Sequence, residues 1–355
     1  MESKKKPTKK CHIIWQNYMR GFIEDNKIFF YLKEQNKIVS HGRRTKKGKE
    51  KLKISIGAEN NLFNYRDEEK EECVDDLESS MGSNEELDFN NLLRGLEQEI
   101  HEIGVLSEKT MKTSRQKIFD MYLFALYKIF FSYVYKYLEI PEKKTKEQRD
   151  YIDILSKCFI HSMQNNYLGL TLNNVLQWFW LFIYIEEPVV YFGDFPFHLR
   201  PNRNNGTDDG NNLTTFLKRK GSNLYFPLNK NLFVIIENRG VNGIFFEKYS
   251  LNDLIIRDIE TENKYKGYDI KPESLIKTIY DRIKSNSDKY RGGATRENIE
   301  KVIDRKIDKT KYWKDPIKFV LENQVKDILE NCIKPCIAKY GYDIENLKKC
   351  FDKCE

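Results

Sequence analysis

The chain has 355 residues, which is enough for one large domain or two ordinary ones. Charged residues make up 32% of it, but 22 Phe and 21 Tyr supply large core side chains, and this aromatic content excludes an intrinsically disordered chain. The net charge of +7 is concentrated in one part of the chain rather than spread evenly, which indicates a local basic surface.

The N-terminal residues are basic, and the segment after them reverses the sign. Sixteen Lys and Arg residues lie within residues 1–53 against five Asp and Glu residues, and residues 1–8 are predicted to be a disordered basic tail. Eleven acidic residues then fall within residues 67–88. The pattern indicates either nucleic-acid contact or mutual neutralisation of the two segments. Two solvated stretches in a Lys- and Glu-rich chain would account for it as well.

Neither a secretory signal nor a membrane span is predicted. The basic start is not followed by an apolar stretch of the signal-peptide type. The most apolar segment, Ile118 to Leu138, contains Asp120, Lys128 and Lys136, each of which would cost about 2.5–3.5 kcal/mol near a membrane centre. We therefore expect a cytoplasmic protein whose seven cysteines are mostly reduced.

Residues 9–66 are predicted to be rich in short β-strands. Lys27 to Lys33 is an apolar run between turn-forming residues, and Asn36 to Ser40 begins its hairpin partner. Gly42 to Lys49 is predicted as a basic loop, after which Lys51 to Ile56 alternates like a further strand.

Helices follow an acidic linker at residues 67–88 and open an α+β body at residues 89–270. Apolar residues recur at helical spacing, and Ser107 begins a stretch that is typical of a helix N-cap. The predicted helices cover Leu87–Val105, 115–138, Gln148–Tyr167 and Asn173–Ile183. The last of them is apolar nearly all round, so we expect it to be buried.

A second group of short strands is predicted between residues 188 and 250, and a helical region between residues 271 and 355. The strands cover Pro188–Phe192, Leu224–Leu228 and Leu232–Ile236, with a polar flexible loop at 201–213. We therefore predict an α+β fold with short N-terminal strands, a large mostly helical body, a second group of strands and a helical C-terminus.

Several motifs resemble those of a known family. His12 to Phe22 reads HIIWQNYMRGF, and later motifs are FIYIEEPV at Phe182–Val189 and FPLNK at Phe226–Lys230. Over about residues 9–240, their order and spacing resemble the bacterial domain-of-unknown-function family 4238, with its HxxPQxYLRxF start and later SDNPV-like and FPLSP-like motifs. Glu186 stands where that family has Asp. The resemblance implies an architecture rather than a chemistry.

The first candidate for catalysis combines His12, Gln16 and Arg20. In a helix, their i, i+4, i+8 spacing places all three on one face. His would act there as a general base, and Arg would bind phosphate through its bidentate fork. The alternative is a structural His12 that bonds the backbone and fixes the entry of the first strand.

The second candidate is a set of carboxylates, of which Glu97 and Glu186 are predicted to be catalytic. Metal-dependent cleavage of a phosphodiester needs two or more carboxylates that converge on a divalent ion such as Mg²⁺ or Mn²⁺. The same set includes Glu59, Glu99 and Glu187. Ordinary surface carboxylates are the alternative, because a chain with 54 acidic residues supplies such pairs by chance.

The C-terminal cysteines form two i, i+4 pairs, Cys332 with Cys336 and Cys350 with Cys354. Across a helical hairpin that turns near Gly341, the four thiolates would bind one structural zinc. A disulfide-linked hairpin and free, partly buried thiols are the other possibilities.

The predicted basic loop supplies a candidate nucleic-acid contact through Arg43, Arg44, Lys46 and Lys47. Basic residues beside a short aromatic strand, here Phe29–Tyr31, can hold a nucleic-acid backbone and stack bases. If these aromatic rings face the core instead, only the phosphate contacts are left.

Two functions follow from these sites. The first is a nucleic-acid-directed enzyme, such as a metal-dependent nuclease in phage defence. The second is a non-enzymatic module that binds nucleic acid or a partner protein. If the first holds, His12 should lie within a few ångströms of Glu97 or Glu186 in a shared cleft. If these groups are scattered, the second is favoured.

Overall fold

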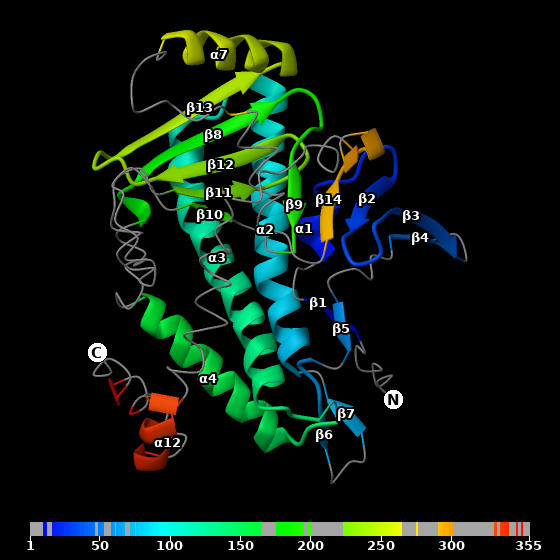
Figure 1. Ribbon diagram of the computed structural model, residues 1–355, viewed down its shortest axis with the longest axis vertical. Coiled ribbons are helices and arrows are strands. Elements are labelled where there is room, and N and C mark those ends of the chain that lie inside the picture. Colours follow the sequence, from blue (N-terminus) through cyan, green and yellow to red (C-terminus); the bar gives the residue numbers. More distant parts are fainter. Residues whose placement is uncertain are drawn as a thin grey trace.

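The computed structural model describes residues 10–12, 16–46, 49–52, 58–60, 62–67, 72–74, 76–141, 143–164, 175–194, 198–200, 223–264, 275, 290–297, 299–300, 330–331, 334–340, 346 and 349–350. These residues form an α+β fold, as predicted, with strands near the N-terminus, long helices in the middle, a second mixed sheet and a short C-terminal helix (Figure 1).

The first sheet contains five strands in the order β4-β3-β2-β14-β9. They are β2 (Lys27–Leu32), β3 (Lys37–Lys46), β4 (Lys49–Leu52), β9 (Tyr191–Gly193) and β14 (Tyr290–Gly293). The predicted hairpin of β2 and β3 is confirmed. The predicted basic loop is wrong, because β3 continues through Lys46 and pairs there with β4. A hairpin without an apolar face lacks the alternation of apolar and polar residues that identifies a strand, so its sequence resembles that of a loop.

Strand β14 joins this sheet from a distant part of the chain. It pairs with β2 on one side and with β9 on the other, in a region where the sequence predicted helix. A Cβ atom on Gly292 would lie only 2.2 Å from the ring of Phe192. Gly292 therefore marks a close approach between neighbouring strands.

The acidic segment 67–88 is structured where the sequence predicted a linker. Strand β6 (Tyr65–Asp67) pairs with β7 (Glu72–Val74), and helix α2 (Asp76–Ile103) begins two residues after β7. Acidic residues are favourable near the positive N-terminal end of a helix dipole, so a run of them is compatible with a helix start. Secondary structure is therefore present in the described part of this segment, because a charge run indicates solvation rather than lack of structure.

Long helices form the middle of the fold: α2, α3 (Glu108–Tyr137) and α4 (Lys146–Gln164). The predicted N-cap is confirmed, since the Ser107 hydroxyl accepts a hydrogen bond from the Thr110 N–H at 3.3 Å. Within the described part of the chain, α3 is the one helix long and apolar enough to cross a membrane. However, 82% of its apolar window is buried inside the protein, as in a core helix. Its Lys128 is fully buried, with the ammonium 4.9 Å from the centre of the Phe124 ring.

The second sheet contains five strands in the order β10-β11-β12-β8-β13. They are β8 (Phe179–Ile185), β10 (His198–Arg200), β11 (Asn223–Pro227), β12 (Leu232–Glu237) and β13 (Gly243–Tyr249). Strand β8 pairs antiparallel with β12 and parallel with β13. Strand β13 lies within the range predicted for the second group of strands, although its own bounds were not predicted, and helix α7 (Leu251–Lys264), which was not predicted, follows it.

Strand β8 corrects the predicted buried helix at Asn173–Ile183. Trp180 and Phe182 alternate along it with Leu181 and Ile183, and all four are buried. A strand covered on both faces is a continuous apolar run without a period of two, so its pattern resembles that of a buried helix. The density of aromatic and β-branched residues was the signal that favoured a strand.

One cluster of buried apolar residues connects the two sheets and the helices. It includes Tyr18 near the N-terminus, Phe30 of β2, Phe130 of α3 and Phe182 of β8. This common core fixes the N-terminal segment against the second sheet, and a cluster of polar residues lies where the segment and the sheet meet.

Candidate functional site

The N-terminal motif is divided between a strand and a short helix. His12 ends β1 (Lys10–His12), where it pairs with Ala58 of β5 (Ala58–Asn60), and helix α1 (Gln16–Arg20) begins only at Gln16. The single helix that would place His12, Gln16 and Arg20 on one face is therefore not formed, because His12 belongs to β1. Gln16 and Arg20 do share α1, whereas the side chains of His12 and Gln16 lie outside what the structure describes.

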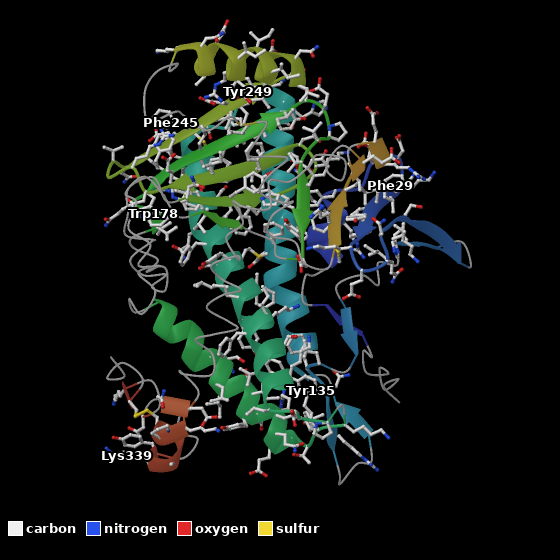
Figure 2. All side chains as sticks on the ribbon, viewed as in Figure 1. Phe29, Tyr135, Trp178, Phe245, Tyr249 and Lys339 are labelled. Atoms are coloured by element: carbon white, nitrogen blue, oxygen red, sulfur yellow. A yellow bond between two sulfur atoms is a disulfide. The ribbon has the colours of Figure 1, made fainter. Side chains whose placement is uncertain are left out.

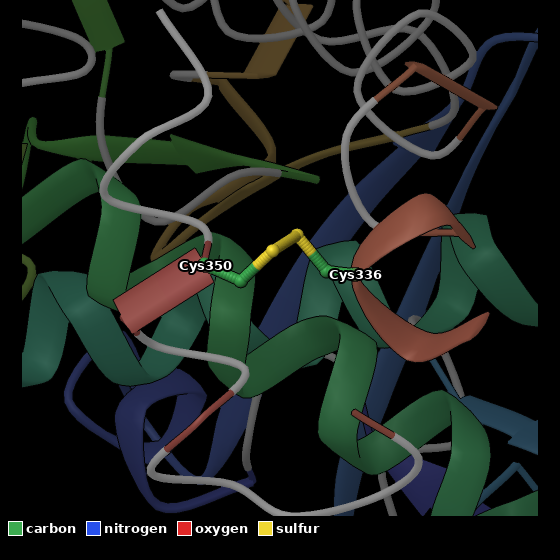
Figure 3. The surroundings of a disulfide bond; sticks show 2 residues. All are labelled: Cys336 and Cys350. Atoms are coloured by element: carbon green, nitrogen blue, oxygen red, sulfur yellow. A yellow bond between two sulfur atoms is a disulfide. The ribbon is translucent and has the colours of Figure 1, made fainter. Parts of the chain in front are cut away.

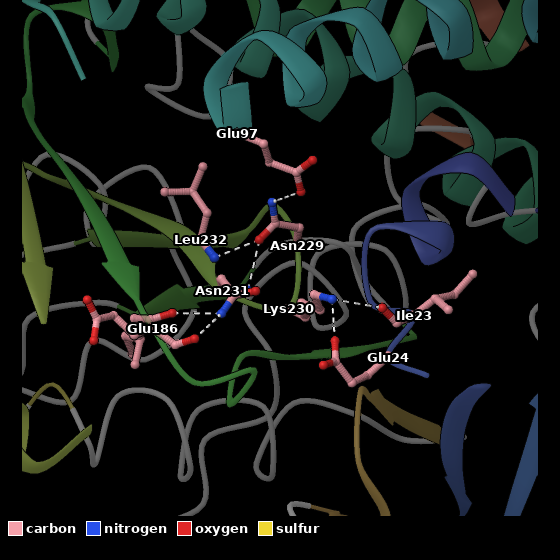
Figure 4. Close-up of polar contacts among 9 residues, drawn as sticks. Ile23, Glu24, Glu97, Glu186, Asn229, Lys230, Asn231 and Leu232 are labelled. Carbon is pink, nitrogen blue, oxygen red and sulfur yellow. Dashed lines mark hydrogen bonds and ion pairs between the residues drawn. The ribbon is translucent and has the colours of Figure 1, made fainter. Parts of the chain in front are cut away.

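The turn between β11 and β12, residues 228–231, holds the N-terminal motif in place (Figure 4). The Lys230 N–H donates a hydrogen bond to the Gly21 carbonyl at 3.1 Å. The Lys230 ammonium donates to the Ile23 carbonyl at 3.1 Å and pairs with the Glu24 carboxylate. The Tyr18 hydroxyl donates to the Pro227 carbonyl at 2.8 Å. Two of the sequence motifs, more than 200 residues apart, are thus in direct contact.

The same turn binds the motif that contains Glu186, but through its backbone. The Asn231 amide donates to the carbonyls of Ile185 and Glu186, at 2.8 and 3.0 Å. The Glu186 carboxylate lies 3.1 Å from the Lys248 ammonium and is exposed. The motif Phe182–Val189 therefore also contacts the turn, although its Glu186 carboxylate pairs with Lys248 of β13 instead.

Glu97 of α2 is the predicted catalytic carboxylate that the turn does bind (Figure 4). The Asn229 side-chain amide donates a hydrogen bond to Glu97 Oε1 at 2.7 Å. The side-chain oxygen of Asn229, Oδ1, accepts hydrogen bonds from the backbone N–H groups of Asn231 and Leu232. Although part of the Glu97 side chain is exposed, the surrounding protein desolvates its carboxyl and raises its pKa. Lys230, the Asn229 hydrogen bond and Arg94 oppose that rise in pKa.

Two other carboxylates of the predicted set, Glu99 and Glu187, have structural partners, whereas the side chain of Glu59 lies outside what the structure describes. Glu99 accepts a hydrogen bond from the Ser107 N–H at 3.1 Å, just before α3 begins. Glu187 accepts one at 2.7 Å from the N–H of Leu251, the first residue of α7. Glu97 and Glu186 likewise bind separate partners, and among the described residues no group of three or more His, Cys, Asp or Glu side chains could hold a metal ion. Glu97 and Glu186 thus bind separate partners, Asn229 and Lys248, and the catalytic roles of these carboxylates and of His12 stay predictions.

The distal part of β3 and all of β4 form a two-stranded basic ribbon, Arg43–Lys46 with Lys49–Leu52, which extends away from the rest of the molecule (Figure 1). In its register, Arg44 lies opposite Lys51 and Lys46 lies opposite Lys49. Residues two positions apart in a strand alternate back to the same face, so these two pairs are four basic positions of one face in the register of the ribbon. Lys47, the remaining predicted contact, lies outside the described residues.

The C-terminal cysteines include one disulfide, between Cys336 beside the core and Cys350 (Figure 3). Their Cα atoms are 5.9 Å apart, and Cys332 and Cys354 lie outside the described residues. The expectation of reduced thiols does not hold for Cys336 and Cys350. In the disulfide they are not thiolate ligands, so the four-cysteine zinc site stays a prediction for the reduced chain. Disulfides persist in oxidising compartments, and the cytoplasmic location stays a prediction that this bond opposes.

The residues at the centre of the contact, Asn229, Lys230 and Asn231, were missed in the sequence as site residues. In the sequence, Phe226–Lys230 indicated only a resemblance to family 4238, whereas the catalytic predictions concerned the charged residues of other motifs. The available signal was a short polar turn between two apolar strands. Both asparagines are buried, at 1% and 9% exposure, so their amides must find partners within the protein.

The resemblance to family 4238 stays a prediction. No family model matches the chain, and neither a curated protein nor a solved structure matches it.

Proposed function

We propose that this protein is a nucleic-acid-binding module whose basic ribbon contacts the phosphate backbone. The observation that carries the proposal is the register of the ribbon, in which Arg44 faces Lys51 and Lys46 faces Lys49. Like charges directly opposite each other destabilise a hairpin, on the ~0.2–1 kcal/mol scale of cross-strand pairs. A row of phosphates would turn this repulsion into attraction, because each neutralised phosphate also releases a condensed counterion.

The position of the ribbon supports the same function. It extends from the edge of the first sheet, where a large ligand meets little obstruction from the rest of the molecule (Figure 1). A two-stranded ribbon is also narrow enough to enter the major groove of a duplex. The described carboxylates bind separate partners instead of gathering around a reaction centre, so binding is favoured over cleavage.

The test removes the charges of one ribbon face. We expect Arg44→Ala, Lys46→Ala, Lys49→Ala and Lys51→Ala, combined, to weaken binding to a short fluorescent DNA duplex. The slope of log affinity against log salt should become shallower by about 0.9 for each phosphate that the variant no longer neutralises. The matched control removes four exposed lysines from α3 and α4: Lys109, Lys112, Lys117 and Lys146. Equal losses of affinity in both variants, or unchanged binding in the ribbon variant, would refute the ribbon as the contact surface.

The same preparation separates binding from hydrolysis. DNA and RNA are incubated with the protein and Mg²⁺ or Mn²⁺, and in parallel with EDTA. Intact nucleic acid in all samples supports the binding module. Cleavage that EDTA and Glu97→Gln both abolish would establish the nuclease instead, with the Glu97 carboxylate as a group that the reaction requires.

A further inference from the structure

An exposed stack of side chains lies at one end of the second sheet. The Phe245 ring stacks on the Phe179 ring with centres 5.1 Å apart and an angle of 26° between planes. The Arg239 guanidinium lies 3.9 Å from the centre of the Phe179 ring. Phe245 is 52% exposed, although aromatic side chains of this size are usually well buried. Figure 2 shows it on β13, across the molecule from the basic ribbon.

The stack depends on a glycine and on an ion pair. Gly243 lies opposite Phe179 in the sheet, and a Cβ atom there would come within 2.7 Å of the Phe245 ring and 3.2 Å of the Phe179 ring. Only glycine therefore leaves room for the two rings to overlap. Glu237, also opposite Phe179, accepts a hydrogen bond from Arg239 Nε at 2.8 Å and holds the guanidinium over the ring. Phe179 thus contacts both the Arg239 guanidinium and the Phe245 ring.

We propose that the open face of Phe245 binds an unpaired base of single-stranded nucleic acid. This inference rests on the proposed function, and adds to it the class of nucleic acid. An exposed ring gives a base a surface on which to stack whatever its sequence, because every base has a π face. An apolar protein partner fits less well, because it would have to desolvate the Arg239–Glu237 ion pair beside the rings. A base stacks through its face and leaves its polar edge toward that pair.

The stack and the ribbon would then have different roles. The ribbon contacts phosphates, which duplex and single strand share, whereas base pairing in a duplex hides the faces that Phe245 would need. The stack therefore predicts that the protein prefers a single strand over a duplex of the same length.

The test uses the full-length protein and three fluorescent probes: oligothymidylate, an abasic oligonucleotide of the same length, and a duplex. Phe245→Ala should weaken binding to oligothymidylate by about 5- to 150-fold, the usual loss for one stacked base. Binding to the abasic strand should be unchanged. Phe245→Tyr, which keeps the ring, should bind like the wild type. Ile259→Ala removes another exposed apolar side chain, 55% exposed on α7, and should also have no effect.

Each outcome decides between the two proposals. Wild-type affinity of Phe245→Ala for oligothymidylate would refute the stack and leave the ribbon standing. An equal loss for oligothymidylate and the abasic strand would also refute base stacking. A wild-type protein that binds none of the three probes would refute the proposed function itself. Because Phe245 is half exposed, its truncation should leave the fold intact, and a melting curve of each variant checks this.

Discussion

Asn229 shows how one side chain can define a junction. Its amide donates to Glu97, and its carbonyl oxygen accepts two backbone N–H groups at 2.8 and 2.7 Å. Replacing it with an apolar residue would leave buried donors without partners, at a cost of about 1–3 kcal/mol for each such group. Four segments meet at this junction: the N-terminal motif, α2, the end of β8 and the turn itself.

The two carboxylates of α2 should respond to pH in opposite directions. The pKa of Glu97 is raised by desolvation, so the folded state loses stability as the pH rises above the ordinary Glu pKa. Desolvation also acts on Glu99, but hydrogen bonds from Thr110 and Ser107 outweigh it and lower that pKa. Glu99 therefore adds stability above the ordinary Glu pKa, and this stability is lost as the pH falls through its lowered value.

As the pH rises from 4 to 7, we therefore expect the stability of Glu97→Gln to increase relative to the wild type. Over the same rise, the stability of Glu99→Gln should decrease relative to the wild type. Urea unfolding at the two pH values measures both differences. Parallel changes in the two variants would contradict the opposite pKa directions.

The sequence predicted some roles of single residues and not others. Ser107 could be identified because a cap and its partner are three residues apart. The hydrogen bond between Asn229 and Glu97 spans 132 residues, and no local pattern encodes a contact of that range. For the same reason, the carboxylates could be named as a set, whereas their separate partners could not.

At the scale of elements, the helices α2 to α4 were predictable because each has a polar and an apolar side or a recognisable cap. Strand β8 was not, since burial on both faces removes the alternation that identifies a strand. The basic ribbon was missed for the opposite reason, because it has no apolar face at all. Both errors concern strands, whose hydrophobic pattern depends on what covers them.

Two glycines provide a matched test of element packing. Gly292→Ala would place a Cβ atom 2.2 Å from the Phe192 ring in the middle of the first sheet, so we expect a loss of about 1–3 kcal/mol or more. Gly95 lies on the exposed side of α2, where an added Cβ atom would meet nothing within 4 Å. Gly95→Ala should therefore raise the free energy of unfolding by about 0.5–1 kcal/mol. Urea unfolding measures both. A neutral Gly292→Ala would contradict the close approach of β14 and β9.

The disulfide should hold the C-terminal helix α12 (Lys334–Tyr340) in place. It closes a loop across a separation of 14 residues, which corresponds to about 3 kcal/mol of stabilisation from the unfolded chain. We expect reducing agent to accelerate tryptic cleavage at the exposed Lys339, and to have no further effect in Cys350→Ser. Cleavage that is insensitive to reduction would contradict this role. Native mass spectrometry of the reduced protein with zinc tests the four-cysteine site in the same experiment.

For the molecule as a whole, the fold class was predictable because strands, helices and a second group of strands follow one another in the sequence. The topology was not, because β9 and β14 each contribute a few residues to a sheet begun more than 150 residues earlier. Strands this short depend on their neighbours for stability, and their own sequence contains little signal.

The position of β14 also determines when the first sheet can be completed. Because β14 lies between β2 and β9, the edge of β2 that it will occupy is open throughout most of the synthesis of the chain. At ~5–20 residues per second, roughly 13–50 s pass between the emergence of β2 and that of β14 from the ribosome. During this time the nascent chain exposes an unpaired strand edge next to its basic N-terminal residues, and such an edge is a template for pairing with another chain.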